Sequence, residues 1–169
     1  MAISHALPLL LLLFFLPALS AINFKYCNES GYDYGIVSRV EISPNPVRPE
    51  DDDSPSFMVF GTASKASKTI SDGAVQVAVS LKSEDNRRII LTTYDLCDDL
   101  LACPIEPGKN FVLNISEVIY SPRYEKEGLF SVTLLDDSGE SDDIEEESVT
   151  RMCVDFYLPT VASTFVSSA

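Results

Sequence analysis

Hydrophobic and polar residues alternate in several short runs along the chain, and turn-forming residues separate the runs. The clearest run spans residues 73–82, where Val75, Val77, Val79 and Leu81 fall on one face and mostly polar residues fall on the other. Alternation with this period predicts a β-strand that buries one face and exposes the other. The chain beyond residue 20 has no comparable helical period, so the pattern favours an all-β protein.

Six further runs complete the pattern. The predicted strands are Tyr34–Ser43, Phe57–Gly61, Gly73–Lys82, Arg88–Asp95, Phe111–Ile115, Leu129–Leu135 and Met152–Leu158. The register of Arg88–Asp95 is not fixed by the pattern, and Phe60 falls on an outer face without an evident reason. Short strands separated by Pro, Gly, Asn and Asp predict an antiparallel β-sandwich of about seven strands.

The faces that should point inward carry almost no charged residues. The side chains expected there are Val40, Ile42, Phe57, Val59, Val75, Val77, Val79, Phe111, Leu113, Ile115, Phe130, Val132, Leu134, Val154 and Phe156. Strand parity alone does not decide whether such side chains line a cavity or fill an ordinary close-packed core.

The first twenty residues predict a secretory signal peptide. The apolar run Leu7–Leu19 has 13 residues, which is too short for a helix to span a bilayer core of about 30 Å. Ala18 and Ser20 place small residues at the −3 and −1 positions of a cut after Ser20. We therefore expect residues 1–20 to be removed and residues 21–169 to form one domain, with its core at about 27–158 and a short tail at 159–169.

Composition excludes several classes of function. The chain has 26 acidic and 12 basic residues, a net charge of −14, which argues against nucleic-acid binding and against electrostatic docking on anionic lipid surfaces. The single histidine, His5, lies within the predicted signal peptide. The mature chain would then lack the base of a Ser-His-Asp or Cys-His site, and no G-x-S-x-G motif occurs. We expect neither enzymatic activity nor a cofactor.

Four cysteines follow the predicted signal peptide, and an even count in a secreted chain predicts two disulfides. Three pairings are possible. Cys97 and Cys103 are six residues apart, so a local loop is the natural pairing, which would leave Cys27 to join Cys153. A metal site built from the four thiolates is disfavoured because no C-x2-C pair occurs.

Two N-glycosylation sequons agree with a secretory route. They begin at Asn28 and Asn114, and Asn114 falls on the outer face of its predicted strand. The segment Asp136–Glu147 holds eight acidic residues and no basic one, which predicts a solvated loop between the last two strands. A calcium site is the alternative for this segment, but the spacing is not that of an EF-hand.

Several segments together resemble a known family. They are Cys27, the sequence I-S-P-N-P-V at Ile42–Val47, Tyr94–Cys97, Cys103–Gly108, and Cys153 in the last strand. Their order resembles the ML domain, the MD-2-related lipid-recognition family that includes the Niemann-Pick type C2 sterol-binding protein. The likeness is closest to the plant branch, the phosphatidylglycerol/phosphatidylinositol transfer protein-like members, and covers about Cys27 to Leu158.

The resemblance implies an immunoglobulin-like sandwich that holds a lipid between its sheets, and disulfides Cys27–Cys153 and Cys97–Cys103. The expected partner is a sterol or a phospholipid, carried by a monomer in the secretory pathway, outside the cell or in a vacuole- or lysosome-like compartment. A transient membrane or protein partner is also allowed. Lys65 with Lys68, and Arg87 with Arg88, are candidates to meet a phosphate head group, and scattered surface charge is the alternative interpretation of each. An alternative is an immunoglobulin-like adhesion or signalling module with a filled core and a protein partner.

Overall fold

The fold is a sandwich of two antiparallel sheets. The computed structural model describes residues 21–47, 54–67, 69–70, 75–82, 87–101, 103–118, 128–136 and 149–159. The elements, in chain order, are β1 (Ala21–Ile22), β2 (Phe24–Tyr26), β3 (Gly35–Ser43), β4 (Ser56–Ala63), β5 (Val75–Lys82), β6 (Arg88–Asp95), η1 (Leu96–Leu100), β7 (Asn110–Ile115), β8 (Leu129–Asp136) and β9 (Val149–Tyr157). No helix among these described residues is long and apolar enough to cross a membrane.

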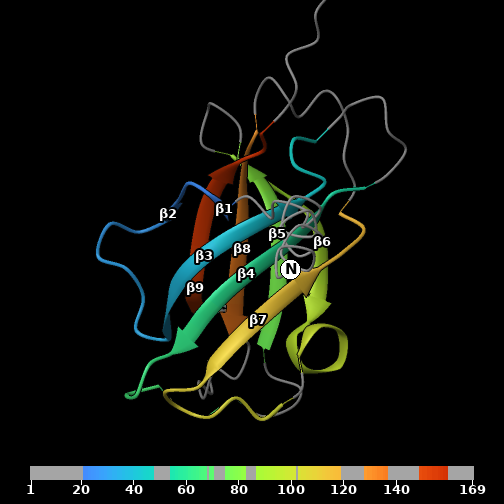
Figure 1. Ribbon diagram of the computed structural model, residues 1–169. Coiled ribbons are helices and arrows are strands. Elements are labelled where there is room, and N and C mark those ends of the chain that lie inside the picture. The colour runs from blue at the N-terminus through green and yellow to red at the C-terminus, as the bar shows by residue number, and fades with distance from the viewer. Residues whose placement is uncertain are drawn as a thin grey trace, which may run out of the picture.

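The strands form one sheet in the order β1-β3-β4-β7 and a second in the order β2-β9-β8-β5-β6. In Figure 1 the strands β3, β4 and β7 lie in the nearer layer and cross in front of β5, β6, β8 and β9. Every ladder within the two sheets is antiparallel. The prediction of an antiparallel β-sandwich is therefore confirmed.

All seven predicted strands are present with small shifts at their ends. Two short strands, β1 and β2, come in addition, before Cys27. They are too short to show alternation, and they form because β1 pairs with β3 while β2 pairs with β9. The undetermined register of β6 also has a physical reason, because its ladder with β5 shifts between Val79 and Ser80. A bulge of this kind breaks strict alternation.

The two sheets enclose one apolar core. Three phenylalanines from three strands meet in it: Phe57 lies with its ring centroid 5.7 Å from that of Phe130 and 5.2 Å from that of Phe156. Both pairs are edge-to-face, which is a favourable geometry for aromatic rings. Because Phe57 belongs to the first sheet and its two partners to the second, the sheets are in direct contact at this level.

A single π-helical turn, η1, leads from β6 toward β7. Its first backbone N–H groups are capped by Asp95, whose carboxylate accepts from the N–H groups of Cys97 at 2.9 Å and Asp98 at 3.0 Å. The N–H of Leu101 donates to the carbonyl of Leu96 at 2.9 Å and closes the turn. The Cys97–Cys103 disulfide then holds this connection as a short loop.

Each open edge of the sandwich is bridged by one tyrosine. At the β2–β3 edge the hydroxyl of Tyr26 accepts a hydrogen bond from the backbone N–H of Val37 at 2.8 Å. At the β6–β7 edge the hydroxyl of Tyr94 donates to the backbone carbonyl of Ser116 at 2.8 Å. Because each bond runs from one sheet to a residue of, or directly after, the other sheet, the two tyrosines hold the layers together at their margins.

Candidate functional site

The fifteen side chains expected to face inward are all buried and all belong to one apolar cluster. The most exposed of them, Val75, is only 6% exposed. The cluster also contains apolar residues outside that set, among them Val37, Leu96, Ile105 and Met152. Its members come from both sheets, so the uncharged interior is continuous from one layer to the other.

Gly61 and Phe111 form a tight contact between β4 and β7. They are cross-strand partners, and a Cβ atom added at Gly61 would lie 2.5 Å from the Phe111 ring. The absence of a side chain at Gly61 therefore leaves the space that the ring occupies. The ring of Phe111 also contacts that of Tyr34, with centroids 6.3 Å apart. Tyr34 and Phe111 lie at one end of the interior, and the cluster of Phe57, Phe130 and Phe156 lies at the other.

A pocket of about 760 Å³ lies at that same end of the sandwich. Its described wall is built from the segment between β2 and β3, the segment after β4, the start of β5, the end of β8 and the start of β9. The described residues that line it are Asn28, Ser30, Gly31, Tyr32, Asp33, Tyr34, Ala66, Ser67, Thr69, Ile70, Val75, Asp136, Val149, Thr150 and Arg151. Its volume falls in the range of small-molecule pockets.

The pocket and the apolar interior share three residues. Tyr34, Ile70 and Val75 line the pocket and also belong to the core cluster. Val75 is thus the one inward-facing candidate among the described pocket residues. A molecule that occupied both spaces would have an apolar part among the core side chains and a polar part among the pocket's amides, hydroxyls and carboxylates.

Tyr34 has an unusual environment at this junction. Its side chain is buried, with 7% of its surface exposed, and its hydroxyl has no hydrogen-bond partner among the described residues. Burial raises the pKa of Tyr34 from 10.0 to about 12, because the phenolate would be poorly solvated there. The hydroxyl is therefore a neutral donor with an unused hydrogen bond at physiological pH, and leaving it unpaired costs about 1–3 kcal/mol.

The charges of the pocket are largely compensated within its own wall. Arg151 contacts Asp136 through two atoms, Nη2 at 2.8 Å and Nε at 2.9 Å from the same carboxylate oxygen, Oδ2. Asp33 adds a further carboxylate, which is exposed. Two carboxylates against one guanidinium give the described wall a net charge of −1, and the one cation in it already has a carboxylate partner.

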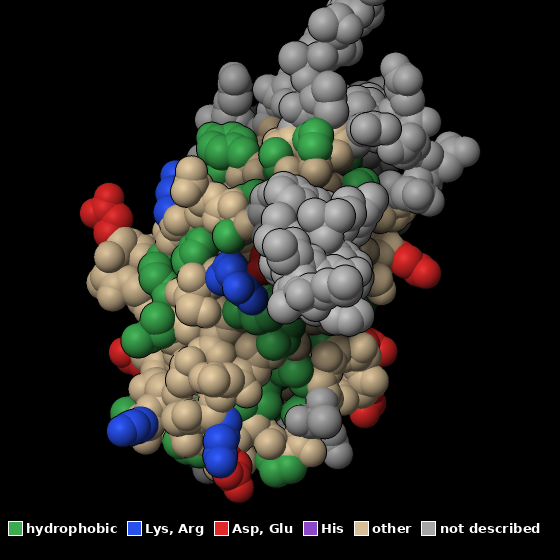
Figure 2. Space-filling model, in the orientation of Figure 1, with side chains coloured by type: hydrophobic (Ala, Val, Ile, Leu, Met, Phe, Trp, Pro, Cys, Tyr) green, Lys and Arg blue, Asp and Glu red, His purple; other side chains and the backbone are tan. Residues whose placement is uncertain are grey.

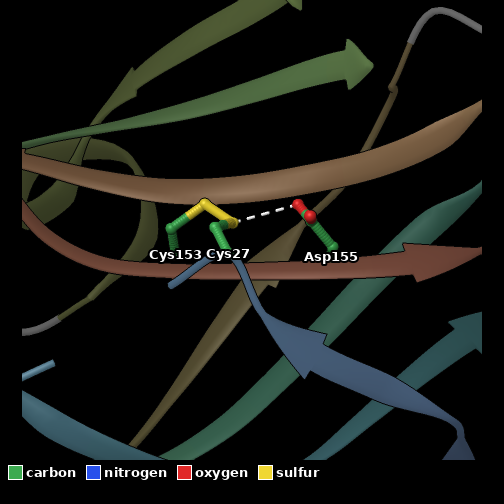
Figure 3. Close-up of side chains that lie close together, drawn as sticks. All are labelled: Cys27, Cys153 and Asp155. Atoms are coloured by element: carbon green, nitrogen blue, oxygen red, sulfur yellow. Dashed lines mark hydrogen bonds between the residues drawn. A yellow bond between two sulfur atoms is a disulfide. The ribbon is translucent and has the colours of Figure 1, made fainter. Parts of the chain in front are cut away.

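The Cys27–Cys153 disulfide anchors one wall of the pocket. Cys27 directly precedes the 28–34 segment and is bonded to Cys153 of β9. Figure 3 shows Asp155 beside this disulfide, with its Oδ1 atom 3.0 Å from Cys27 Sγ. A disulfide sulfur carries no proton, so the contact is not a hydrogen bond donated by cysteine. In the oxidised form neither sulfur is a thiolate, so the grouping of Cys27, Cys153 and Asp155 offers no thiolate ligand to a metal.

Asp155 lies in a buried polar row on the outer face of the second sheet. Ser131, its cross-strand partner on β8, donates a hydrogen bond to Asp155 Oδ1 at 2.5 Å, and both residues are at most 2% exposed. Arg88 reaches the same group from β6, with Nη2 3.9 Å from Asp155 Oδ1 and Nη1 3.5 Å from Cys153 Sγ. This basic residue is therefore engaged on the outer face and does not line the pocket.

The remaining sequence candidates occupy several places. Lys65 is exposed and is not among the described pocket residues, whereas Lys68 and the acidic segment 137–148 lie outside the described residues. Asn28 and Asn114 are both exposed, and Asn28 lies at the pocket rim. Figure 2 shows most of the visible acidic side chains near the outline of this face of the molecule.

The position of Phe60 on an outer face is explained by its neighbour. Phe60 is the cross-strand partner of Arg39, whose guanidinium carbon lies 4.1 Å from the centre of the phenylalanine ring. This is a cation–π contact. Arg39 also pairs with Glu41 at 2.8 Å through its Nε atom. The aromatic side chain therefore belongs to a surface cluster and not to the interior.

These features define a disulfide-bonded β-sandwich with an uncharged interior and a pocket at one end, the architecture of a binding protein. Comparison with known proteins gives its family. Residues 21–157 match the family model of the ML domain. The MD-2-related lipid-recognition protein 3 of Arabidopsis thaliana is 42% identical over 175 aligned residues, covering 99% of this chain and 99% of the relative. The MD-2-related lipid-recognition protein ROSY1 of Arabidopsis thaliana is 40% identical, covering 80% of this chain and 79% of the relative.

The chain therefore belongs to the ML-domain family. This family generally consists of non-enzymatic binding proteins that recognise lipids. Family membership and the two disulfides together indicate the secretory pathway. The resemblance to the ML domain and the two expected disulfides, Cys27–Cys153 and Cys97–Cys103, are confirmed.

Sequence reasoning missed the pocket. The alternation predicts Tyr34 only as the first residue of a strand, and Ile70 and Val149 lie outside the predicted strands. These residues come from five separate segments that only the fold brings together. One signal was available: Tyr32 and Tyr34 stand close together, shortly after Cys27, in a segment otherwise rich in small and polar residues.

Proposed function

We propose that the chain is a secreted lipid-binding or lipid-transfer protein that holds a sterol or a phospholipid between its two sheets. The observation that carries this proposal is the continuity of the uncharged interior with the pocket, through Tyr34, Ile70 and Val75. Family membership supports it, because relatives over nearly the full length bear the name of lipid-recognition proteins. The fifteen inward side chains are the candidates for the wall of the lipid site.

The energetics of such a site are favourable without any charged contact. Burying roughly 400 Å² of apolar lipid surface at about 25 cal/mol per Å² yields an upper bound near 10 kcal/mol. The loss of translational and rotational freedom on association takes several kcal/mol from that figure. The remainder corresponds to micromolar or tighter binding. The mechanism is exclusion of water and fit of shape, and no bond of the ligand is made or broken.

The ligand must find room in a core that is close-packed in part. The rings of Phe57, Phe130 and Phe156 contact one another across the sheets, so a lipid tail would enter from the pocket end and separate these layers. The same ring contacts favour the second candidate function, an adhesion or signalling module with a filled core and a protein partner. The two candidates differ in whether purified protein carries lipid.

The test is native mass spectrometry and lipid extraction of the protein secreted from cells. A carrier should hold about one lipid molecule per chain. Val75→Phe, at the junction of pocket and interior, should lower the bound lipid, whereas the matched control Val112→Phe should not, because Val112 is 37% exposed on β7. Absence of lipid from the wild-type protein, with no uptake of added sterol or phospholipid, would favour the filled-core module.

The route of the protein belongs to the same proposal. Cleavage after Ser20 would leave a mature domain at 21–169, bound for the extracellular space or a vacuole- or lysosome-like compartment, and acting as a monomer. The exposed side chains of Asn28 and Asn114 suit glycan attachment. N-terminal sequencing and a mass measurement before and after removal of N-linked glycans test the cut and both sequons.

A further inference from the structure

We infer that the pocket at the β3–β5–β9 end binds an uncharged lipid head group that offers a hydrogen-bond acceptor, and that Tyr34 is the residue that recognises it. The inference rests on the proposed lipid-carrier function and narrows it to a class of ligand. We therefore expect a lipid with an anionic head group, such as a sulfate or a phosphate monoester, to bind less tightly than its uncharged counterpart.

The first argument is the position of Tyr34. It is shared between the 760 Å³ pocket and the apolar core, so a lipid with its body between the sheets and its head in the pocket passes along this side chain. Its ring lies against that of Phe111, which in turn fills the space over Gly61. The ring is therefore held by its neighbours, and its hydroxyl oxygen is buried within a residue that belongs both to the core and to the pocket wall.

The second argument is the unpaired hydroxyl. A buried donor without a partner is uncommon in folded proteins. In the part of the chain that the structure describes, the Tyr34 hydroxyl is one of two buried side-chain groups with an atom that lacks a partner, and it is the one beside the pocket. The hydroxyl oxygen is covered in this structure, so a ligand that separates the packing beside it, and that offers a hydroxyl, ether or carbonyl oxygen, would supply the missing acceptor. The gain on binding is larger than for an exposed donor, which would first have to give up its bond to water.

The third argument is the charge of the described pocket wall. Arg151 is its one cation, and Asp136 already neutralises it at 2.8 Å. Among the described residues of the wall, an anionic head would therefore meet no positive charge that lacks a carboxylate partner. A cationic head is not favoured either, because Asp136 is paired and Asp33 is exposed to solvent. An uncharged head group loses far less solvation energy than a charged one on entering such a pocket, and a hydrogen bond from the wall can offset that loss.

The experiment uses pairs of lipids that share one body and differ in the head. Delipidated secreted protein is offered equal amounts of cholesterol and cholesterol sulfate, and separately of dioleoylglycerol and dioleoyl phosphatidic acid. Native mass spectrometry measures the bound fraction of each. We expect the uncharged member of whichever pair binds to exceed its anionic partner by about tenfold or more.

Two variants test the assigned residues. Tyr34→Phe removes only the hydroxyl and should lower the affinity for the uncharged lipid about fivefold, the equivalent of one hydrogen bond. Asp136→Asn frees Arg151 from its carboxylate partner and should raise the share of the anionic lipid several-fold. Tyr157→Phe is the matched control, because Tyr157 is 68% exposed and is not among the described pocket residues.

The outcomes separate this inference from the proposed function. Equal or preferred binding of the anionic lipids, or unchanged affinity in Tyr34→Phe, would overturn the head-group assignment while lipid carriage stands. Failure of all four lipids to bind the wild-type protein, together with no lipid recovered from the secreted protein, would overturn both. A neutral preference that depends on Tyr34 and weakens in Asp136→Asn supports the inference.

Discussion

Tyr94 and Ser116 close the edge of the sandwich between β6 and β7, where the tyrosine hydroxyl donates to the backbone carbonyl at 2.8 Å. Tyr26 makes the corresponding contact at the opposite edge, but with the reverse polarity: it accepts from the N–H of Val37. The two contacts also differ in exposure, since Ser116 is exposed whereas Val37 is 4% exposed. The two edges should therefore respond differently to loss of the hydroxyl.

We expect Tyr26→Phe to destabilise the protein by about 1–2 kcal/mol and Tyr94→Phe by less than about 1 kcal/mol. The first variant leaves a buried N–H without its acceptor, whereas the second leaves a carbonyl that water can reach. Equilibrium urea unfolding measures both values, with Tyr157→Phe as the control that should change little. A larger effect in Tyr94→Phe than in Tyr26→Phe would contradict this account of the edges.

The two disulfides should contribute unequally to stability. Cys27 and Cys153 are 126 residues apart and Cys97 and Cys103 only six, and the loss of chain entropy grows with the length of the closed loop. On that model, replacing both cysteines of the long pair by serine lowers the free energy of unfolding by roughly 5 kcal/mol, and of the short pair by roughly 2 kcal/mol. Thermal melts of the two double variants check the order, and equal losses would count against it.

Gly61 should be intolerant of substitution because of Phe111. A methyl group there would lie 2.5 Å from the ring, so Gly61→Ala should destabilise the protein by about 1–3 kcal/mol through overpacking. Phe111→Leu removes the ring and should make the added methyl group much less harmful. A double-mutant cycle measured by urea unfolding should show strong coupling, and simple additivity of the two changes would refute the proposed contact.

The strands could be predicted because most of them bury one face. Val75, Val77 and Val79 all point into the core, as their alternation indicates. The pattern could not reveal that outward-facing Ser131 and Asp155 are buried as well, because the groups beside Asp155, which include Arg88 and Cys27, come from other parts of the chain. Nor could it reveal β1 and β2, which are stable only through pairing with β3 and β9.

The pocket could not be predicted from the sequence, for a related reason. Its residues share no period, and Tyr34 and Arg151 are far apart in the chain. The disulfide partners were accessible because few pairings of four cysteines exist, and a local loop is the simplest of them. Covalent and periodic features can thus be inferred from sequence, whereas a missing hydrogen-bond partner, as at the Tyr34 hydroxyl, emerges only from the packed structure.

Tyr34→Phe should make the lipid-free protein more stable, in contrast to most substitutions in a core. The variant keeps the ring against Phe111 and removes a buried hydroxyl that has no partner among the described residues, which should raise the free energy of unfolding by about 1 kcal/mol at neutral pH. The difference should also depend on pH, because the pKa of Tyr34 is raised to about 12 in the folded protein from 10.0.

The sign follows from proton binding in the two states. Above pH 10 the unfolded chain loses the Tyr34 proton while the folded protein retains it, so the wild-type protein loses stability as the pH rises toward about 12. This component amounts to roughly 2 kcal/mol and is absent from Tyr34→Phe, so the advantage of the variant should widen over that interval. Urea unfolding of both proteins at neutral pH, at pH 10 and at about pH 12 measures it. A constant difference between the two proteins across this range would mean that the Tyr34 hydroxyl is not buried as described.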